Sequence, residues 1–139
     1  MLKVFSPILL TAAFLCSQSV SAAPNIRQFM VQPTGQATFR CAFQGKAASR
    51  PCTVKLTQEQ VTNPTVVAFH GAGQLSKVFS VYWPDGDVSR YVEIDSLELV
   101  NLTERNGTGY NIRTREWPEV DWSRGYVIEK NGREWLRLW

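Results

Sequence analysis

The sequence predicts an all-β domain, a small antiparallel barrel or sandwich of about seven to nine short strands. Short segments in which apolar and polar residues alternate are separated by turns rich in glycine, proline and asparagine. Downstream of residue 22, no stretch shows helical periodicity over the ~11 residues that the signal requires. Two cysteines, Cys41 and Cys52, lie where a bridge between neighbouring strands would fit this arrangement.

Residues 1–22 have the pattern of a secretory signal peptide. Lys3 precedes an apolar run, and a cleavage site follows at Val20-Ser21-Ala22. Removal of this segment would leave one domain, residues 23–139, with 14 basic and 12 acidic side chains, because only Lys3 is lost from the 15 basic residues. The resulting charge of +2 is evenly spread and gives no support for nucleic-acid binding. No later segment reaches the ~18 to 20 apolar residues of a membrane span, so we expect a secreted or periplasmic protein.

The spacing around the two cysteines predicts a stapled hairpin. The chain has three cysteines, and removal of residues 1–22 takes Cys16 and leaves two. An exported chain with an even cysteine count is expected to pair them, and two cysteines allow one connectivity. If Cys41 lies opposite Cys52, then Phe39 faces Val54, and the apolar residues of both strands share one face. We therefore expect the disulfide to stabilise a hairpin, not to present a basic loop residue to a protease.

A second hairpin is predicted over residues 77–94, with its turn at 84–87. Pairing Trp83 with Val88 would place four apolar side chains on one face, with Arg90 as the exception; the four are Phe79, Val81, Val92 and Ile94.

Further strands are predicted at residues 64–69, 97–102 and 110–117. The tail is predicted to form a hairpin around Asn131-Gly132, a dipeptide that favours a type I′ turn.

The sequence has few residues suited to catalysis or to metal binding. His70 is the only histidine, and no Gly-x-Ser-x-Gly motif accompanies it, so a serine triad lacks its nucleophile. One histidine and two paired cysteines do not make a zinc site. We expect no enzyme activity, no metal and no cofactor.

Paired carboxylates offer one catalytic alternative, a small glycan hydrolase. Asp85 and Asp87 sit in a predicted turn, where aspartate is common for backbone reasons. Glu116, Glu119 and Asp121 cluster beside Trp117 and Trp122, but clustered acids near a turn are usually solvated. This alternative is less favoured than a binding role.

The C-terminal aromatic residues are the most unusual feature of the composition. Four of the five tryptophans lie in the final 23 residues, at positions 117, 122, 135 and 139. Tryptophan usually fills the core of a small β-domain, and we expect this of Trp135 and Trp139. Trp117 and Trp122 fall in the irregular, acidic stretch "REWPEVDWSRG", and exposed tryptophans can bind sugars or a protein partner.

Two resemblances can be stated. The segment "VYWPDGDVSRYV", residues 81–92, resembles small secreted bacterial β-proteins that carry a Trp-Pro-Asp-Gly hairpin and have no assigned activity. The motifs "FRC", "GTGY" and "WSRG" resemble the periplasmic C-type lysozyme inhibitor family, whose members form an eight-stranded antiparallel barrel.

The second resemblance implies roles for particular residues. In that family a serine and a basic residue enter the lysozyme cleft, and here Thr108 stands at the serine position and Arg124 at the lysine position. Tyr110, Trp122 and Gly125 match the family's motifs directly. The sequence departs from the family in both substitutions, in a shorter spacing before the tyrosine, and in its second cysteine, which the family carries near the C-terminus.

The sequence thus predicts an exported, non-catalytic β-domain that binds an unknown protein or glycan through a C-terminal tryptophan and arginine surface. The candidate contact residues are Thr108, Tyr110, Trp117, Trp122 and Arg124. Inhibition of C-type lysozyme is the alternative. The ligand, the oligomeric state and the use of the glycosylation sequons at Asn101 and Asn106 stay open.

Overall fold

The computed structural model describes residues 25–95, 98–103, 113–116, 122–130 and 132–139. These ranges hold ten strands, two short α-helices and a 3-10 turn: α1 (Ile26–Met30), β1 (Gly35–Phe39), β2 (Cys41–Phe43), β3 (Lys46–Ala47), β4 (Cys52–Gln60), α2 (Pro64–His70), β5 (Leu75–Tyr82), β6 (Val88–Asp95), β7 (Glu98–Thr103), β8 (Arg113–Glu116), η1 (Trp122–Arg124), β9 (Tyr126–Lys130) and β10 (Arg133–Leu138). The predicted all-β class is confirmed. β3 has only two residues, so nine strands have three or more.

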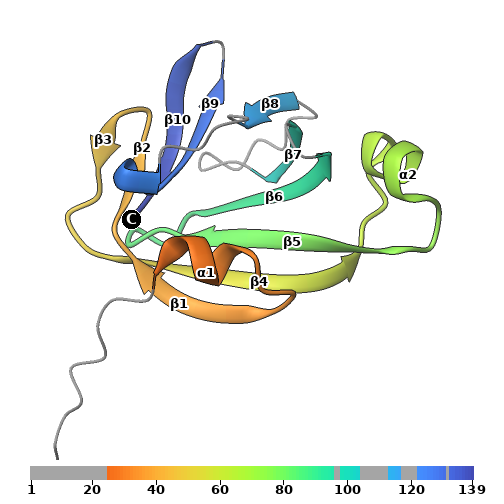
Figure 1. Cartoon of the computed structure of the whole chain (residues 1–139), viewed down its shortest axis with the longest axis horizontal. Helices are drawn as coiled ribbons and strands as arrows, with labels where there is room; N and C mark the ends of the chain where they lie inside the picture. The colour runs from red at the N-terminus through yellow and green to blue at the C-terminus, as the bar shows by residue number, and fades with distance from the viewer. Residues whose placement is uncertain (1–24, 96–97, 104–112, 117–121, 131) are drawn as a thin grey trace, which may run out of the picture.

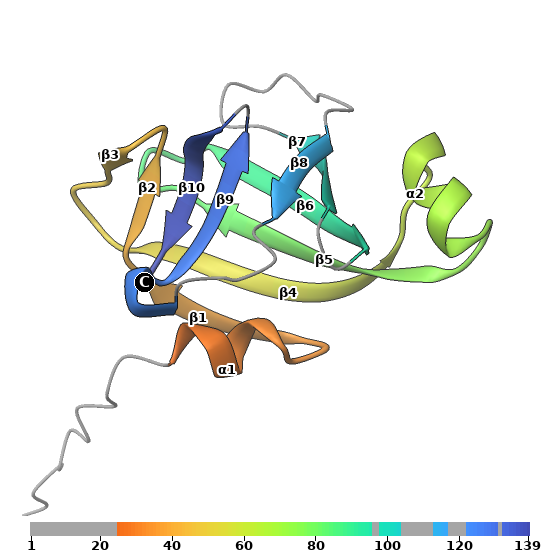
Figure 2. The same cartoon turned by 45° about the horizontal axis from the view of Figure 1, so that its top comes forward.

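The strands are antiparallel and hydrogen-bonded in the order β1-β4-β5-β6-β7-β8-β9-β10-β2-β3. β1 and β3 end this order, so the described strands do not close into a barrel. The sheet curls into two layers instead. β1, β4, β5 and β6 lie side by side in one layer, and β2, β9 and β10 run across it in the other (Figures 1 and 2).

One residue, Arg40, connects the two layers. It separates β1, which pairs with β4, from β2, which pairs with β10. The Arg40 N–H donates to the Trp139 carbonyl at 2.8 Å, and the Trp139 N–H donates to the Arg40 carbonyl at 3.0 Å. A single bent segment therefore belongs to both layers, and its bend is held by the last residue of the chain.

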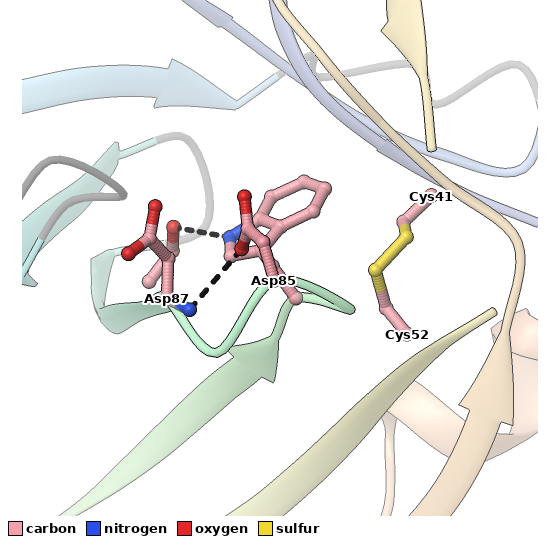
Figure 3. The surroundings of a disulfide bond; sticks show 6 residues. Cys41, Cys52, Asp85 and Asp87 are labelled. Atoms are coloured by element: carbon pink, nitrogen blue, oxygen red, sulfur yellow. Dashed lines mark hydrogen bonds between the residues drawn. A yellow bond between two sulfur atoms is a disulfide. The ribbon is translucent and has the colours of Figure 1, made fainter. Parts of the chain in front are cut away.

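The disulfide lies at this bend. The sulfur atoms of Cys41 and Cys52 are at bonding distance and their Cα atoms are 6.0 Å apart, which joins the start of β2 to the start of β4 (Figure 3). The predicted hairpin register is wrong by two residues, because Phe39, not Cys41, lies opposite Cys52. The bend at Arg40 takes Cys41 out of the β1–β4 ladder. An even shift keeps the same side chains on one face, so the predicted apolar face is preserved.

We call the layer formed by β1, β4, β5 and β6 the long layer, and both of its faces are covered by other side chains. The main core lies between the two layers and contains the buried residues of α1, whose Phe29 packs on Phe39 with ring centroids 5.1 Å apart. The Asn25 side chain caps α1 by accepting from the Arg27 and Gln28 N–H groups. A smaller cluster lies on the other face of the layer, where Val66 of α2 packs against β5, β6 and β7.

The strand predicted at residues 64–69 is wrong, because this segment is the helix α2. Its N-terminus is built from two adjacent residues. Asn63 accepts from the Thr65 and Val66 N–H groups at 2.9 and 3.4 Å, and Pro64 occupies the first turn, where its missing N–H costs nothing.

The predicted register of the second hairpin is wrong by one residue, because Val88 pairs with Tyr82, not with Trp83. Its four apolar residues therefore divide between two clusters. Phe79 and Val81 face the main core, whereas Val92 and Ile94 face the cluster under α2. β5 and β6 carry apolar residues on both faces, so a single apolar face could not fix their register.

The remaining strand predictions hold in the described ranges. β7 matches the strand expected at 97–102, and β8 lies within the one expected at 110–117. β9 and β10 form the predicted tail hairpin, with Arg133 opposite Lys130. Asn131, the first residue of the expected turn, lies outside the described residues.

The side chain of Asn101 on β7 is fully buried, and its amide nitrogen and oxygen have no hydrogen-bond partner. A glycan on this nitrogen would need access to solvent, so the folded chain cannot carry one at the Asn101 sequon. The sequon at Asn106 lies outside the described residues.

A polar contact crosses three strands of the long layer. Arg90 on β6 bonds to the carboxylate of Glu59 on β4 and to the Ser80 hydroxyl on β5. The Arg90 guanidinium holds the pKa of Glu59 below its ordinary value of 4.5, and a hydrogen bond from Thr57 adds to this effect.

The Glu59–Arg90 contact predicts an acid-dependent loss of stability. Because the folded pKa of Glu59 lies below its unfolded pKa, the contact stabilises fully above about pH 4.5 and is lost as the pH falls through the folded value. Both side chains are about one-third exposed, so we expect Glu59→Gln to cost only about 0.5 kcal/mol at pH 7 and less at pH 3. Urea unfolding at both pH values measures this. A cycle with Arg90→Gln isolates the pair, and an equal cost at both pH values would contradict the assignment.

Candidate functional site

Of the predicted contact residues, Trp122 and Arg124 lie in the described part of the chain; Thr108, Tyr110 and Trp117 lie outside it. Trp122 and Arg124 are the two ends of η1, directly before β9. The next residue, Gly125, adopts a φ of 90°, and a Cβ placed on it would lie 2.1 Å from the Leu138 carbonyl oxygen. This close approach fixes η1 against the end of β10.

Trp122 is half-buried and packs on the main core. Its ring centroid lies 6.1 Å from that of Tyr126, and the Arg27 guanidinium of α1 lies 5.8 Å from the ring. The ring thus joins α1 to the C-terminal hairpin, and only part of it is accessible to a partner.

Arg124 reaches the outer side of β10. Its side chain is 55% exposed, and its guanidinium donates to Glu134 Oε1 at 3.0 Å. The structure therefore gives the two ends of η1 different surroundings. Trp122 packs on the core, whereas Arg124 is solvent-accessible.

A second arginine shares the same carboxylate. Arg137 Nε lies 3.6 Å from Glu134 Oε1, beyond hydrogen-bond distance, and this nitrogen is buried with no hydrogen-bond partner. The Arg137 guanidinium lies 4.1 Å from the centroid of the Trp139 ring, and Trp139 is 39% exposed. We call Arg124, Glu134, Arg137 and Trp139 the hairpin surface.

Trp135 and Trp139, both predicted to lie in the core, differ in how far they are buried. Trp135 is half-buried and packs on Phe43, with ring centroids 5.0 Å apart. More than a third of Trp139 is exposed, so it does not lie in the core. The sequence did not indicate that Trp139 lies at the surface.

Cationic groups lie over four aromatic rings in the described ranges. The pairs are Arg27 with Trp122, Lys55 with Tyr82, Lys130 with Trp135 and Arg137 with Trp139. Each cation occupies one face of its ring, so a sugar could stack there only by displacing it. These rings are better suited to a partner that brings negative charge.

The sequence held a signal for part of this arrangement. Arg137 lies near the end of β10 and Trp139 directly follows the strand, and residues two apart in an extended segment share a face. Alternation alone does not predict that Glu134 lies beside these residues, because a bulge between Glu134 and Leu136 shifts the alternation of β10.

His70, Asp85 and Asp87 are the residues weighed for catalysis whose side chains the structure describes, and they do not come together as a reactive site. His70 Nδ1 lies 2.7 Å from Ser76 Oγ, but Ser76 is only 2% exposed and cannot meet a substrate. The Asp85 carboxylate accepts from the Asp87 N–H at 3.2 Å, which is turn chemistry (Figure 3). The side chains of Glu116, Glu119 and Asp121 lie outside what the structure describes.

Within the described ranges, no group of three or more histidine, cysteine, aspartate or glutamate side chains could hold a metal ion. The longest helix there, α2, has seven residues, and none is long and apolar enough to cross a membrane.

Comparison with protein-family models, curated proteins and solved structures found nothing similar to this chain.

Proposed function

We propose that this chain is an exported, disulfide-bonded, non-catalytic domain that binds a partner protein through a carboxylate of that partner. The hairpin surface is the contact. The observation that carries the proposal is a cluster in which two arginines, Arg124 and Arg137, share the single carboxylate of Glu134 beside an exposed tryptophan. Both arginine side chains are partly exposed, so a partner's carboxylate can reach them.

Charge and donor count favour a carboxylate as the acceptor. Arg124 and Arg137 together carry ten N–H donors, and Glu134 is the carboxylate that lies between them. The pair of arginines leaves one positive charge unbalanced, and a guanidinium binds a second carboxylate in bidentate geometry. Arginine and tryptophan are also the residue types that dominate the binding energy of protein interfaces, which favours a protein partner.

Inhibition of C-type lysozyme is a more specific candidate. Arg124 stands where the inhibitor family has its basic residue, and its half-exposed guanidinium already binds a carboxylate of its own chain. A lysozyme cleft presents catalytic carboxylates, and Arg124 would exchange Glu134 for them. Thr108 and Tyr110 would complete this contact according to the resemblance.

The test uses two probes, poly-L-glutamate and a C-type lysozyme. We expect the oxidised protein to bind poly-L-glutamate with a change in tryptophan fluorescence. We expect Arg137→Ala to weaken binding at least about tenfold, the cost of losing a charge-assisted hydrogen bond. Arg50→Ala, which removes an exposed arginine elsewhere, serves as the matched control. Equal binding by both variants would remove the hairpin surface from the proposal.

The lysozyme arm follows the clearing of a cell-wall suspension. Dose-dependent protection that Arg124→Ala abolishes and Arg50→Ala retains would make the chain a lysozyme inhibitor. No protection at large excess would exclude that candidate and leave the general binding proposal in place. Turnover of a glycan or ester by the protein itself would contradict a non-catalytic role.

A further inference from the structure

Two hollows flank the turn between β2 and β3, and of their lining residues only Glu134 belongs to the hairpin surface. One, of about 270 Å³, lies between this turn and the β5–β6 turn; Lys46, Ser49, Trp83 and Asp85 line it. The other, of about 600 Å³, lies against the tip of the C-terminal hairpin; Lys130, Arg133, Glu134 and Trp135 line it. Gln44, in the turn itself, lines both.

Gln44 is held in a conformation that glutamine disfavours. Its φ is 51°, and it is the one residue other than glycine with a positive φ in the ranges that the structure describes. The next residue, Gly45, also has a positive φ, of 77°, and hairpin turns of this kind ordinarily use asparagine or aspartate before the glycine. The Gln44 N–H donates to the Trp135 carbonyl at 2.8 Å, which ties the turn to β10. Strain retained at a surface position is typical of a binding residue.

Aromatic residues that line the two hollows pack against one another. The Phe43 ring packs edge-on against Trp83 at 5.6 Å and against Trp135 at 5.0 Å between centroids. Trp83 is fixed in turn by an indole N–H that donates to Ser89 Oγ at 2.8 Å. Packed rings therefore join the wall of the smaller hollow, which includes Phe43 and Trp83, to that of the larger one, which includes Trp135, and Gln44 borders both hollows.

The rim of the two hollows is more basic than acidic. Lys46, Lys130 and Arg133 face Asp85 and Glu134, and Glu134 already bonds to Arg124. Packed aromatic rings, an amide that borders both hollows and cations in each of them suit an elongated ligand that carries hydroxyl groups and carboxylates. We propose that the two hollows form one groove that binds a uronate-containing oligosaccharide, with Gln44 hydrogen-bonded to the sugar between them.

An acidic peptide fits this groove less well. A peptide that binds a sheet edge needs a strand long enough for several main-chain hydrogen bonds, whereas β3, the edge strand here, has two residues. An oligosaccharide needs no such edge, because its contacts are to side chains.

The test measures calorimetric binding of trigalacturonate to the oxidised protein and to Gln44→Gly. This variant deletes the side chain but keeps a residue that prefers a positive φ, so its midpoint of thermal unfolding should be equal or higher. We expect trigalacturonate to bind the wild type and to bind Gln44→Gly about tenfold or more weakly. Maltotriose, which lacks carboxylates, should bind neither. Arg133→Ala should also weaken binding, whereas Trp139→Ala, in the hairpin surface, should leave it unchanged.

Each other result overturns the proposal. Equal affinity of the wild type and Gln44→Gly would show that Gln44 makes no contact with the ligand. Tighter binding of hexaglutamate than of trigalacturonate would assign the groove to an acidic peptide, and binding of neither would remove the groove. Loss of trigalacturonate binding in Trp139→Ala would place the sugar on the hairpin surface instead. If the hairpin surface does not bind poly-L-glutamate, the proposed function fails, but the results expected for the groove are unchanged.

Discussion

Replacement of Gly125 by alanine is expected to be among the most damaging single substitutions in the domain. The added Cβ would lie 2.1 Å from the Leu138 carbonyl oxygen and 2.8 Å from Trp139 Cβ. The first of these atoms is backbone and cannot rotate away, so η1 must move off β10. Together with the strain of a positive φ, this should lower the free energy of unfolding by roughly 3 kcal/mol or more.

Gly86→Ala is the matched control for Gly125→Ala. The two glycines have φ values of 93° and 90°, but nothing lies within 4 Å of a Cβ placed on Gly86. This control should cost only the conformational penalty, about 1 kcal/mol. Urea unfolding of both variants separates contact from conformation, and equal losses would contradict the close approach of Gly125 to β10.

Loss of the Cys41–Cys52 bond should have an effect of similar size. The two cysteines are 11 residues apart and almost wholly buried. In the chain-entropy model a closed loop of this length stabilises by roughly 3 kcal/mol, because the unfolded chain is constrained. The double variant Cys41→Ala with Cys52→Ala removes the bond without burying a hydroxyl group.

Chemical reduction of the wild type provides the comparison for the double variant. Urea unfolding with and without reductant should show a large loss for the wild type and no change for the double variant, whose baseline should match the reduced protein to within about 1 kcal/mol, the cost of its two missing sulfur atoms. A wild type that is equally stable when oxidised and reduced would show that the bond does not stabilise the fold.

The fold class and most strands could be predicted from the sequence. The features that were predicted wrongly or not at all depend on contacts between residues distant in the chain. Alternation identifies β4, because it has one buried face. β7 instead buries Leu99 in the main core and Val100 in the cluster under α2, so its signal is a short apolar run. The apolar run at residues 64–69 predicts a strand on its own, whereas Asn63 and Pro64 carry the signal of a helix N-terminus. The bend at Arg40 left no local mark, because its cause is a hydrogen bond to Trp139 at the other end of the chain.

The candidate site was predictable in part. The motif around Trp122 and Arg124 drew attention to η1, and the structure describes both residues there. Their different surroundings follow from the turn at Gly125, which depends on a contact with β10 and not on a local pattern. The strain at Gln44 was hidden for a similar reason, since composition shows which residue occupies a turn and not which dihedral angles it adopts.

The place of the final strand has a consequence for how the chain folds during its biosynthesis. β10 follows every other described strand along the chain, yet it must pair with β2, near the beginning of the domain. The two layers therefore cannot join until β10 has been synthesised, and contacts so distant in sequence form slowly. A nascent chain would stay incompletely folded until β10 has left the ribosome.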